Sequence, residues 1–361
     1  MTATEKLRDI GQSIWLDNIT RDLLNNGTLK NYIEQMSVTG LTSNPSIFES
    51  ALKKSSAYDE SIASNLAAGH SGEQLFFKLA MEDLGRAADL FQPVYERTNR
   101  VDGFVSLEVS PLLARDSAST LAAATALYRQ AGRANLFIKI PGTKDGLPAI
   151  EEAIFAGLPV NITLLFSREQ YVAAADAYMR GVERRIEAGL NPDVRSVASV
   201  FISRWDVAVA SRVPAELVNG LGIAIAQQTY RAYSELLGSA RWQRAFNSGA
   251  SAQRLLWAST GTKDPNASDT LYISALAAPF TVNTIPEGTL NAFSDHGEVG
   301  TLLPGDGGDC ERILAAYSSA GINVTDLAEQ LQDQGAKSFV KSWHGLLAEC
   351  EAKSAAIRQA D

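Results

Sequence analysis

The chain has 361 residues, of which 45% are hydrophobic and 20% are charged, and this balance is typical of a globular protein with a large core. Acidic residues outnumber basic ones, 41 to 32, and the net charge of −9 argues against nucleic acid or an anionic membrane as the main partner. The N-terminus has no apolar signal core, no apolar run is long enough to span a membrane, and the two cysteines lack a metal or redox spacing. We therefore expect a cytoplasmic protein.

Short β-like runs alternate with longer helical segments along the whole chain. The runs cover residues 13–19, 38–44, 104–110, 136–142, 158–166, 194–202, 254–260 and 280–286. The alternation predicts parallel strands joined by right-handed helical crossovers, and eight such strands are the number in a (β/α)8 TIM barrel. An open doubly wound sheet is the alternative, although no G-x-G-x-x-G motif opens the first helix.

Two stretches of the chain predict helices beyond those of a minimal barrel. Residues 45–103 are too many for one crossover and predict two or three helices. Beyond residue 287 the runs ERILAAYSSAG and KSFVKSWHGLLAECEAKSAAIRQ predict the last barrel helix and a C-terminal helical appendage. We expect one TIM-barrel domain over residues 1–361, with the barrel at about 13–320 and the C-terminal helices, about 321–361, packed on it.

A lysine interrupts the predicted strand NLFIKIPGT, residues 135–143. Three apolar residues precede Lys139, an isoleucine follows it, and Pro141-Gly142 ends the strand. Lysine is rarely buried unless it is paired or needed for function. Lys139 is therefore an edge residue, a salt-bridged core residue or a reactive amine.

Other polar residues fall at or just beyond the C-terminal ends of the predicted strands, the end at which TIM barrels build their active sites. They are Asp17, Thr42, Asn44, Glu108, Asn161, Thr163, Ser199, Arg204 and Ser259. Each has a structural explanation as well. Asp17 is suited to cap a helix that starts near Thr20, and Asn44, which precedes a proline, is suited to turn the chain. Together, however, they are more than a structural core requires, and they predict a site.

This set of side chains suits Schiff-base catalysis. A neutral amine attacks a ketone, and the iminium that forms withdraws electrons so that an adjacent carbon–carbon bond can break. Burial favours the neutral amine, whereas an ion pair with a carboxylate opposes it. We therefore expect Glu108 and Asp17 to lie near the substrate rather than against the amine of Lys139. One carboxylate would move protons during imine formation, and the other would accept the hydroxyl proton as the bond breaks.

The motifs LTSNPSIF, SLEVS, FIKIPGT, VNITLLFS and SVFISRWD resemble those of the transaldolases in type and order, over about residues 13–290. WASTGTKDPNASDTLY is similar to the longer bacterial members. The resemblance implies a TIM barrel of the pentose phosphate pathway. It would move a dihydroxyacetone unit from sedoheptulose 7-phosphate or fructose 6-phosphate to glyceraldehyde 3-phosphate or erythrose 4-phosphate, without metal or other cofactor. Sugar phosphates would be its partners, and we expect a monomer or a homodimer.

The resemblance also implies a role for each site residue. Lys139 would form the Schiff base, Glu108 with a water on Thr163 would move protons, and Asp17 would deprotonate the donor's C4 hydroxyl. The residues implied to bind the substrate are Thr42, Asn44, Ser106, Asn161, Ser199 and Arg204, the last of which would hold the phosphate.

The chain departs from the family pattern at the seventh strand. Shorter members carry an arginine soon after the strand's serine, whereas Ser259 is followed here by Thr-Gly-Thr-Lys. We expect Lys263 to supply the second positive charge, although residues 262–265 also suit a surface turn. Two alternatives stay open: a Schiff-base fructose-6-phosphate-type aldolase that releases dihydroxyacetone, and a sugar-phosphate binding barrel without activity.

Overall fold

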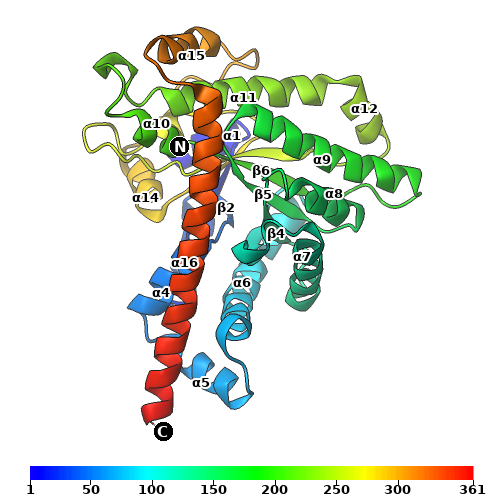
Figure 1. Cartoon of the computed structure of the whole chain (residues 1–361), viewed down its shortest axis with the longest axis vertical. Helices are drawn as coiled ribbons and strands as arrows, with labels where there is room; N and C mark the ends of the chain where they lie inside the picture. Colours follow the sequence, from blue (N-terminus) through cyan, green and yellow to red (C-terminus); the bar gives the residue numbers. More distant parts are fainter. Residues whose placement is uncertain (361) are drawn as a thin grey trace.

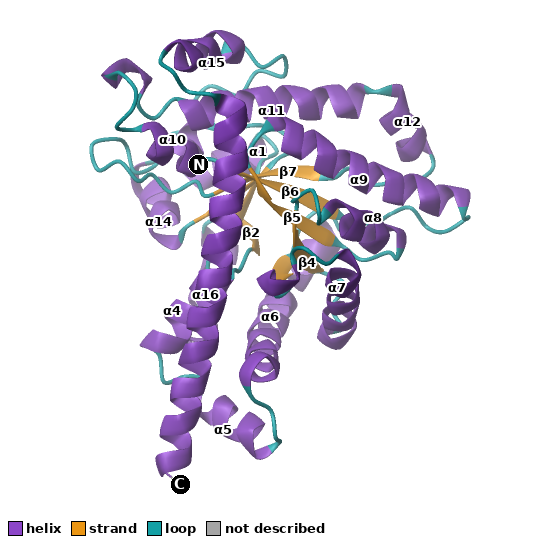
Figure 2. Ribbon diagram, viewed as in Figure 1, coloured by secondary structure: helices purple, strands orange, loops and turns teal. Residues whose placement is uncertain are grey.

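Eight parallel strands lie at the centre of the computed structural model, which describes residues 1–360, and helices surround them (Figure 2). The strands are β1 (Ser13–Leu16), β2 (Val38–Leu41), β3 (Val105–Glu108), β4 (Leu136–Pro141), β5 (Val160–Leu165), β6 (Ser196–Phe201), β7 (Arg254–Ala258) and β8 (Val282–Ile285). Each lies inside one of the eight predicted runs, so the sequence-based prediction of the strands is confirmed.

The strands form a nearly closed barrel. Their order is β2-β1-β8-β7-β6-β5-β4-β3, and all neighbours that pair are parallel. The two edges approach each other, because the Leu41 amide donates to the Phe104 carbonyl and the Gly103 amide to the Thr39 carbonyl, each over 2.9 Å. The predicted (β/α)8 TIM barrel is confirmed, and the alternative of an open doubly wound sheet is wrong.

One helix precedes β1, and helices fill the connections between successive strands. Up to β8 they are α1 (Ala3–Asp9), α2 (Arg21–Asn25), α3 (Thr28–Gln35), α4 (Pro45–Lys54), α5 (Asp59–Ala67), α6 (Gly72–Arg97), η1 (Pro111–Leu113), α7 (Ser117–Ala131), α8 (Leu147–Phe155), α9 (Arg168–Glu187), α10 (Ser203–Val209), η2 (Ala215–Leu217), α11 (Leu221–Gly238), α12 (Ala240–Asn247) and α13 (Leu271–Ala275). The long connection between β2 and β3 holds three of them, α4 to α6, as its length predicts.

The chain after β8 forms α14 (Glu287–His296), α15 (Cys310–Ser319) and α16 (Val324–Ala360). Helix α16, orange to red in Figure 1, runs in front of the strands and continues past α4 to end beside α5. It begins well before the helical run predicted from Lys337. Trp343, Leu346 and Cys350 are buried on one side of it, and the Trp343 ring packs edge-on against Phe76 of α6 at 5.2 Å. This apolar stripe fixes the helix to the β2–β3 connection.

Large apolar side chains fill the N-terminal half of the barrel. Trp15, Phe104 and Phe137 lie together there, with the last two rings stacked 4.1 Å apart. Side chains alternate between the two faces of a strand, so the residues two and four positions further along β3 and β4 also point inward. Ser106 and Glu108 on β3 and Lys139 on β4 are polar, and only the last of these positions, Pro141, is not. The barrel interior therefore becomes more polar toward the C-terminal ends of the strands. Within residues 1–360, no helix combines the length and the apolar character that crossing a membrane requires.

Candidate active site

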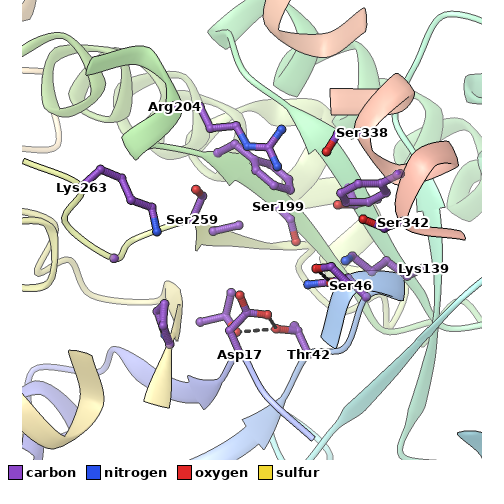
Figure 3. A pocket seen from close by; sticks show the side chains of 18 residues that line it. Asp17, Thr42, Ser46, Lys139, Ser199, Arg204, Ser259, Lys263, Ser338 and Ser342 are labelled. Atoms are coloured by element: carbon purple, nitrogen blue, oxygen red, sulfur yellow. Dashed lines mark hydrogen bonds between the residues drawn. The ribbon is translucent and has the colours of Figure 1, made fainter. Parts of the chain in front are cut away.

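A cavity of about 220 Å³ opens at the C-terminal ends of the strands. Nine of the twelve predicted site residues line it: Asp17, Thr42, Asn44, Lys139, Thr163, Ser199, Arg204, Ser259 and Lys263 (Figure 3). The other three, Ser106, Glu108 and Asn161, are buried immediately behind its wall. The lining residues come from the ends of every strand except β3 and from α16, and β3 contributes the buried Ser106 and Glu108 behind the wall.

Lys139 lies at the floor of the cavity and contacts Glu108. The two residues are register partners on β3 and β4, and Lys139 Nζ is 3.2 Å from Glu108 Oε2. Nζ also donates to the Ser43 carbonyl oxygen over 3.1 Å. Only 5% of Lys139 and 4% of Glu108 is exposed. The expectation that both carboxylates lie away from the amine is therefore wrong for Glu108, because adjacent inward-facing positions on paired strands cannot be separated.

The Glu108 carboxyl group has a raised pKa and one oxygen atom without a hydrogen-bond partner among the described residues. Burial raises its pKa to about 6, although the attraction of the Lys139 ammonium opposes the shift. Its second oxygen, Oε1, and the buried hydroxyl of Thr163 have no hydrogen-bond partner within residues 1–360. Buried polar atoms are almost always hydrogen-bonded, so these two point to a bound water or substrate. The arrangement supplies an amine, a carboxyl group and a hydroxyl around one reacting centre.

Asp17 lies across the cavity from Lys139 (Figure 3). Its Oδ1 accepts a hydrogen bond from the Thr42 hydroxyl over 2.8 Å, and that hydroxyl is 2.6 Å from the hydroxyl of Thr284 on β8. Burial raises the pKa of Asp17, while Lys139, the Thr42 hydrogen bond and Lys263 act in the opposite direction. Asp17 does not cap a helix, as its structural explanation required, because Thr20 caps α2 with its own hydroxyl. Asp17 thus has a carboxyl group with a raised pKa, held toward the cavity by Thr42.

Asn161 is held between two serines one layer below the cavity. Its Nδ2 donates to the Ser106 hydroxyl over 3.1 Å, and its Oδ1 accepts from the Ser199 hydroxyl over 2.7 Å. All three are buried on neighbouring inward-facing positions of β3, β5 and β6. The serines therefore fix the orientation of the Asn161 amide.

Asn44 has a structural role in addition to its place in the cavity wall. Its Oδ1 caps α4 by accepting from the Ile47 amide over 3.1 Å and from the Ser46 hydroxyl over 2.6 Å. The cap holds the side chain in one orientation at the start of the helix. The turn suggested by the Asn44-Pro45 sequence and the predicted position in the site are therefore compatible.

Two cations lie on the wall away from Lys139, with Ser259 nearby (Figure 3). Neither Arg204 nor Lys263 has a carboxylate within 4.0 Å among the described residues, and burial lowers the pKa of Arg204. The Arg204 guanidinium carbon is 5.5 Å from the centre of the Phe201 ring. Lys263 lines the cavity, which argues against the alternative of a purely surface turn. Two cations without a carboxylate in ion-pair contact favour the binding of an anion such as a phosphate.

Sequence reasoning missed half of the residues that line the cavity. They are Ser46, Phe201, Ala258, Gly261, Thr284, Pro286, Ser338, Phe339 and Ser342. Thr284 could have been found from the sequence, because it is a polar residue toward the C-terminal end of its strand, as Thr163 is. Ser338, Phe339 and Ser342 could not, since they belong to α16. The centre of the Phe339 ring is 5.4 Å from Lys139 Nζ, so this helix reaches the buried amine of Lys139. Within residues 1–360, no group of three or more His, Cys, Asp or Glu side chains is arranged to bind a metal ion.

The barrel and its buried lysine–carboxylate pair place the chain among TIM-barrel proteins equipped for Schiff-base chemistry on carbonyl compounds. The family model Transaldolase/Fructose-6-phosphate aldolase matches residues 14–350, and the chain belongs to this family. It is 44% identical over 352 residues to a transaldolase of Thermobifida fusca (strain YX), covering 95% of this chain and 96% of the relative. It is 42% identical over 368 residues to a transaldolase of Arthrobacter sp. (strain FB24), covering 99% of each chain.

Proposed function

We propose that this chain is a transaldolase that works through a Schiff base on Lys139. Its donor would be sedoheptulose 7-phosphate or fructose 6-phosphate, and its acceptor glyceraldehyde 3-phosphate or erythrose 4-phosphate, as in the pentose phosphate pathway. The observation that carries the proposal is the position of the Lys139 amine, which is buried beside Glu108 at the floor of a cavity with two cations on its far wall. The names of its relatives support the same reaction.

In the first step, the Lys139 amine attacks the C2 carbonyl carbon of the ketose. The carbonyl oxygen leaves as water after two proton transfers, and a carbon–nitrogen double bond forms. Glu108, within 3.2 Å of the amine, is the group that moves these protons. The Thr163 hydroxyl and Glu108 Oε1, which lack protein partners, hold the water through which they travel.

In the second step, the bond between C3 and C4 breaks. Asp17 takes the proton of the C4 hydroxyl, C4 leaves as the aldehyde of the shortened sugar, and the electron pair of the broken bond enters the iminium. The raised pKa of Asp17 makes it a stronger base, and the Thr42 hydrogen bond holds the carboxylate toward the cavity. The enamine that remains on Lys139 then adds to the acceptor aldehyde, and Asp17 returns the proton.

The remaining site residues bind the sugar. Arg204, Lys263 and Ser259 bind the phosphate, because they form a cationic wall at the end of the cavity away from Lys139. Asn44 and Asn161 bind hydroxyls of the three-carbon unit. Thr42, Ser106 and Ser199 support them through the hydrogen bonds to Asp17 and to Asn161.

The test is a measurement of products with and without an acceptor. A transaldolase given fructose 6-phosphate alone releases no more glyceraldehyde 3-phosphate than one molecule per active site. Adding erythrose 4-phosphate should start continuous turnover to sedoheptulose 7-phosphate. Continuous release of free dihydroxyacetone without acceptor would instead make the protein an aldolase, and the absence of any product would make it a binding barrel.

We also propose a cytoplasmic location and a single domain over residues 1–361. Cys310 and Cys350 are buried and unpaired, which suits a reducing compartment. The core cluster that includes Trp343, Leu346 and Cys350 of α16 also contains residues of the barrel strands, which supports one folding unit. The monomer or homodimer expected from the sequence stays a prediction.

A further inference from the structure

Helix α16 presents one side to the C-terminal ends of β4 and β5. Gln332, Gly335 and Phe339 lie on this side, three and seven positions apart, as neighbouring turns of a helix require. Gln332 Nε2 donates to the Leu164 carbonyl over 2.9 Å and is 3.3 Å from the Gly142 carbonyl oxygen. A Cβ added at Gly335 would lie 2.9 Å from Leu164 Cδ2, so the Leu164 side chain would have to shift to admit it. The helix therefore contacts the strand ends closely.

The residue that Gln332 holds has a strained backbone. Leu164 has φ +62°, the left-handed region, and its side chain is buried. Bulky residues other than glycine adopt this region rarely, because it brings Cβ close to a backbone carbonyl oxygen. The register between β5 and β6 is irregular at this point, between Ile162 and Leu165. Such strain persists only where surrounding contacts hold it, and it concentrates at functional sites.

Both carbonyls bound by Gln332 belong to segments that carry reacting groups. Leu164 directly follows Thr163, so the conformation of Leu164 sets the direction in which the Thr163 side chain points. Gly142 lies three residues after Lys139, and its amide donates to the Thr163 carbonyl over 2.7 Å. One side chain of α16 thus connects the ends of the two strands on which Lys139 and Thr163 stand.

We propose that Gln332 is a positioning residue for the reaction and that α16 is therefore an integral part of the active site. It holds the strained turn at Leu164 so that the Thr163 hydroxyl faces Lys139 and Glu108, where the protons of imine formation move. The inference rests on the function proposed above for Lys139 and Thr163. It assigns to the C-terminal helix a task in the chemical step beyond covering the barrel.

The test compares Gln332→Met with Gln334→Met. Methionine keeps the length of glutamine but cannot donate a hydrogen bond, and Gln334 is an exposed glutamine on the same helix. For Gln332→Met we expect kcat for transfer, and the rate at which borohydride traps the fructose 6-phosphate adduct, to fall about fivefold, with KM little changed, because a hydrogen bond is worth about 1 kcal/mol. Gln334→Met should match the unaltered protein. Equal kcat and trapping rates in the two variants would overturn the proposal.

Gln332→Glu provides a second readout that a purely structural role would not alter. An ionised glutamate would face two carbonyl oxygens, whereas a protonated one can donate to the Leu164 carbonyl. Its activity relative to the unaltered protein should therefore decline as the pH rises, and a constant ratio would contradict the proposal. If the unaltered protein forms no adduct at all, the proposed function fails and this inference with it. If that protein is active and the Gln332 variants equal it, only this inference fails.

Discussion

The two ends of the barrel bury charged side chains in opposite ways. At the N-terminal end, Asp102 Oδ1 accepts from the Trp15 indole over 2.7 Å, and its Oδ2 accepts from the Ser13 hydroxyl. Arg254 Nη1 lies 3.7 Å from that carboxylate, and its Nη2 donates to the Thr281 carbonyl over 2.9 Å. At the C-terminal end, Glu108 Oε1 and the Thr163 hydroxyl have no protein partner within residues 1–360.

The difference distinguishes a charge cluster that protein atoms complete from one that they leave incomplete. A buried charge costs free energy unless it is paired and hydrogen-bonded, and the N-terminal cluster meets that requirement with protein atoms alone. The C-terminal cluster leaves polar atoms beside a cavity of about 220 Å³, so a ligand has to complete it. Burial of a lysine or a carboxylate is therefore weaker evidence of function than an incomplete set of hydrogen bonds around it.

The largest effect should come from Lys139→Ala, which removes the nucleophile. We expect transfer activity to fall to the background rate, because no other described amine contacts Glu108. The fold should persist or become more stable, since Glu108, with a pKa of about 6, can take up a proton and reach the cavity. Exposed Lys144, in the loop after β4, provides the control Lys144→Ala, which should keep full activity. Detectable transfer by Lys139→Ala would contradict the mechanism.

Asp17→Asn should separate bond formation from bond cleavage. We expect transfer to fall by a factor of about 10² to 10⁴, because the C4 hydroxyl loses its base while Lys139 stays intact. Borohydride with fructose 6-phosphate should then trap an adduct that carries the whole hexose phosphate. Mass spectrometry measures this directly. An adduct of only three carbons, formed at the normal rate, would show that Asp17 is not the base.

Asp102→Ala should lower the stability of the fold strongly and change the catalytic rate little, the opposite of what we expect for Lys139→Ala. Removing the carboxylate leaves the buried Arg254 guanidinium without a counter-ion and the Trp15 indole without an acceptor, which costs about 3–5 kcal/mol in the free energy of unfolding. Denaturant unfolding measures this loss. Well below the unfolding midpoint, kcat should stay near that of the unaltered protein. A selective loss of kcat with unchanged stability would remove the contrast between the two ends.

The smallest predicted effect is a pH dependence from Glu108. Its pKa is raised to about 6, so the carboxyl group is ionised, and able to accept a proton, only above that pH. The rate of Schiff-base formation should therefore rise with pH around 6 and then level off. Glu108→Gln should be slower and should lack this rise. If the rise persists unchanged in Glu108→Gln, another group is responsible for it.

Most of the barrel, and the part of the site that points inward from the strands, can be predicted from the sequence. Polar residues such as Lys139 and Asn161 interrupt otherwise apolar strands and so mark the site. The contact between Glu108 and the Lys139 amine cannot be predicted in this way, because it depends on the register between two strands. Nor does the sequence reveal the contribution of α16. Gln332 and Leu164 are 168 residues apart, and no local pattern joins them. The buried pair of Asp102 and Arg254 was not predicted either. Polar residues just before a strand or at its start are common, because a loop ends there, and they give no sign of burial.

The most direct test of the central claim is borohydride reduction of the protein mixed with fructose 6-phosphate, followed by mass mapping of its peptides. We predict a reduced dihydroxyacetone adduct on Lys139 alone, in the segment NLFIKIPGT. Erythrose 4-phosphate added before the reductant should remove the adduct by accepting the three-carbon unit. An adduct on another lysine, or none on a folded protein, would contradict the assignment of Lys139 as the reacting amine.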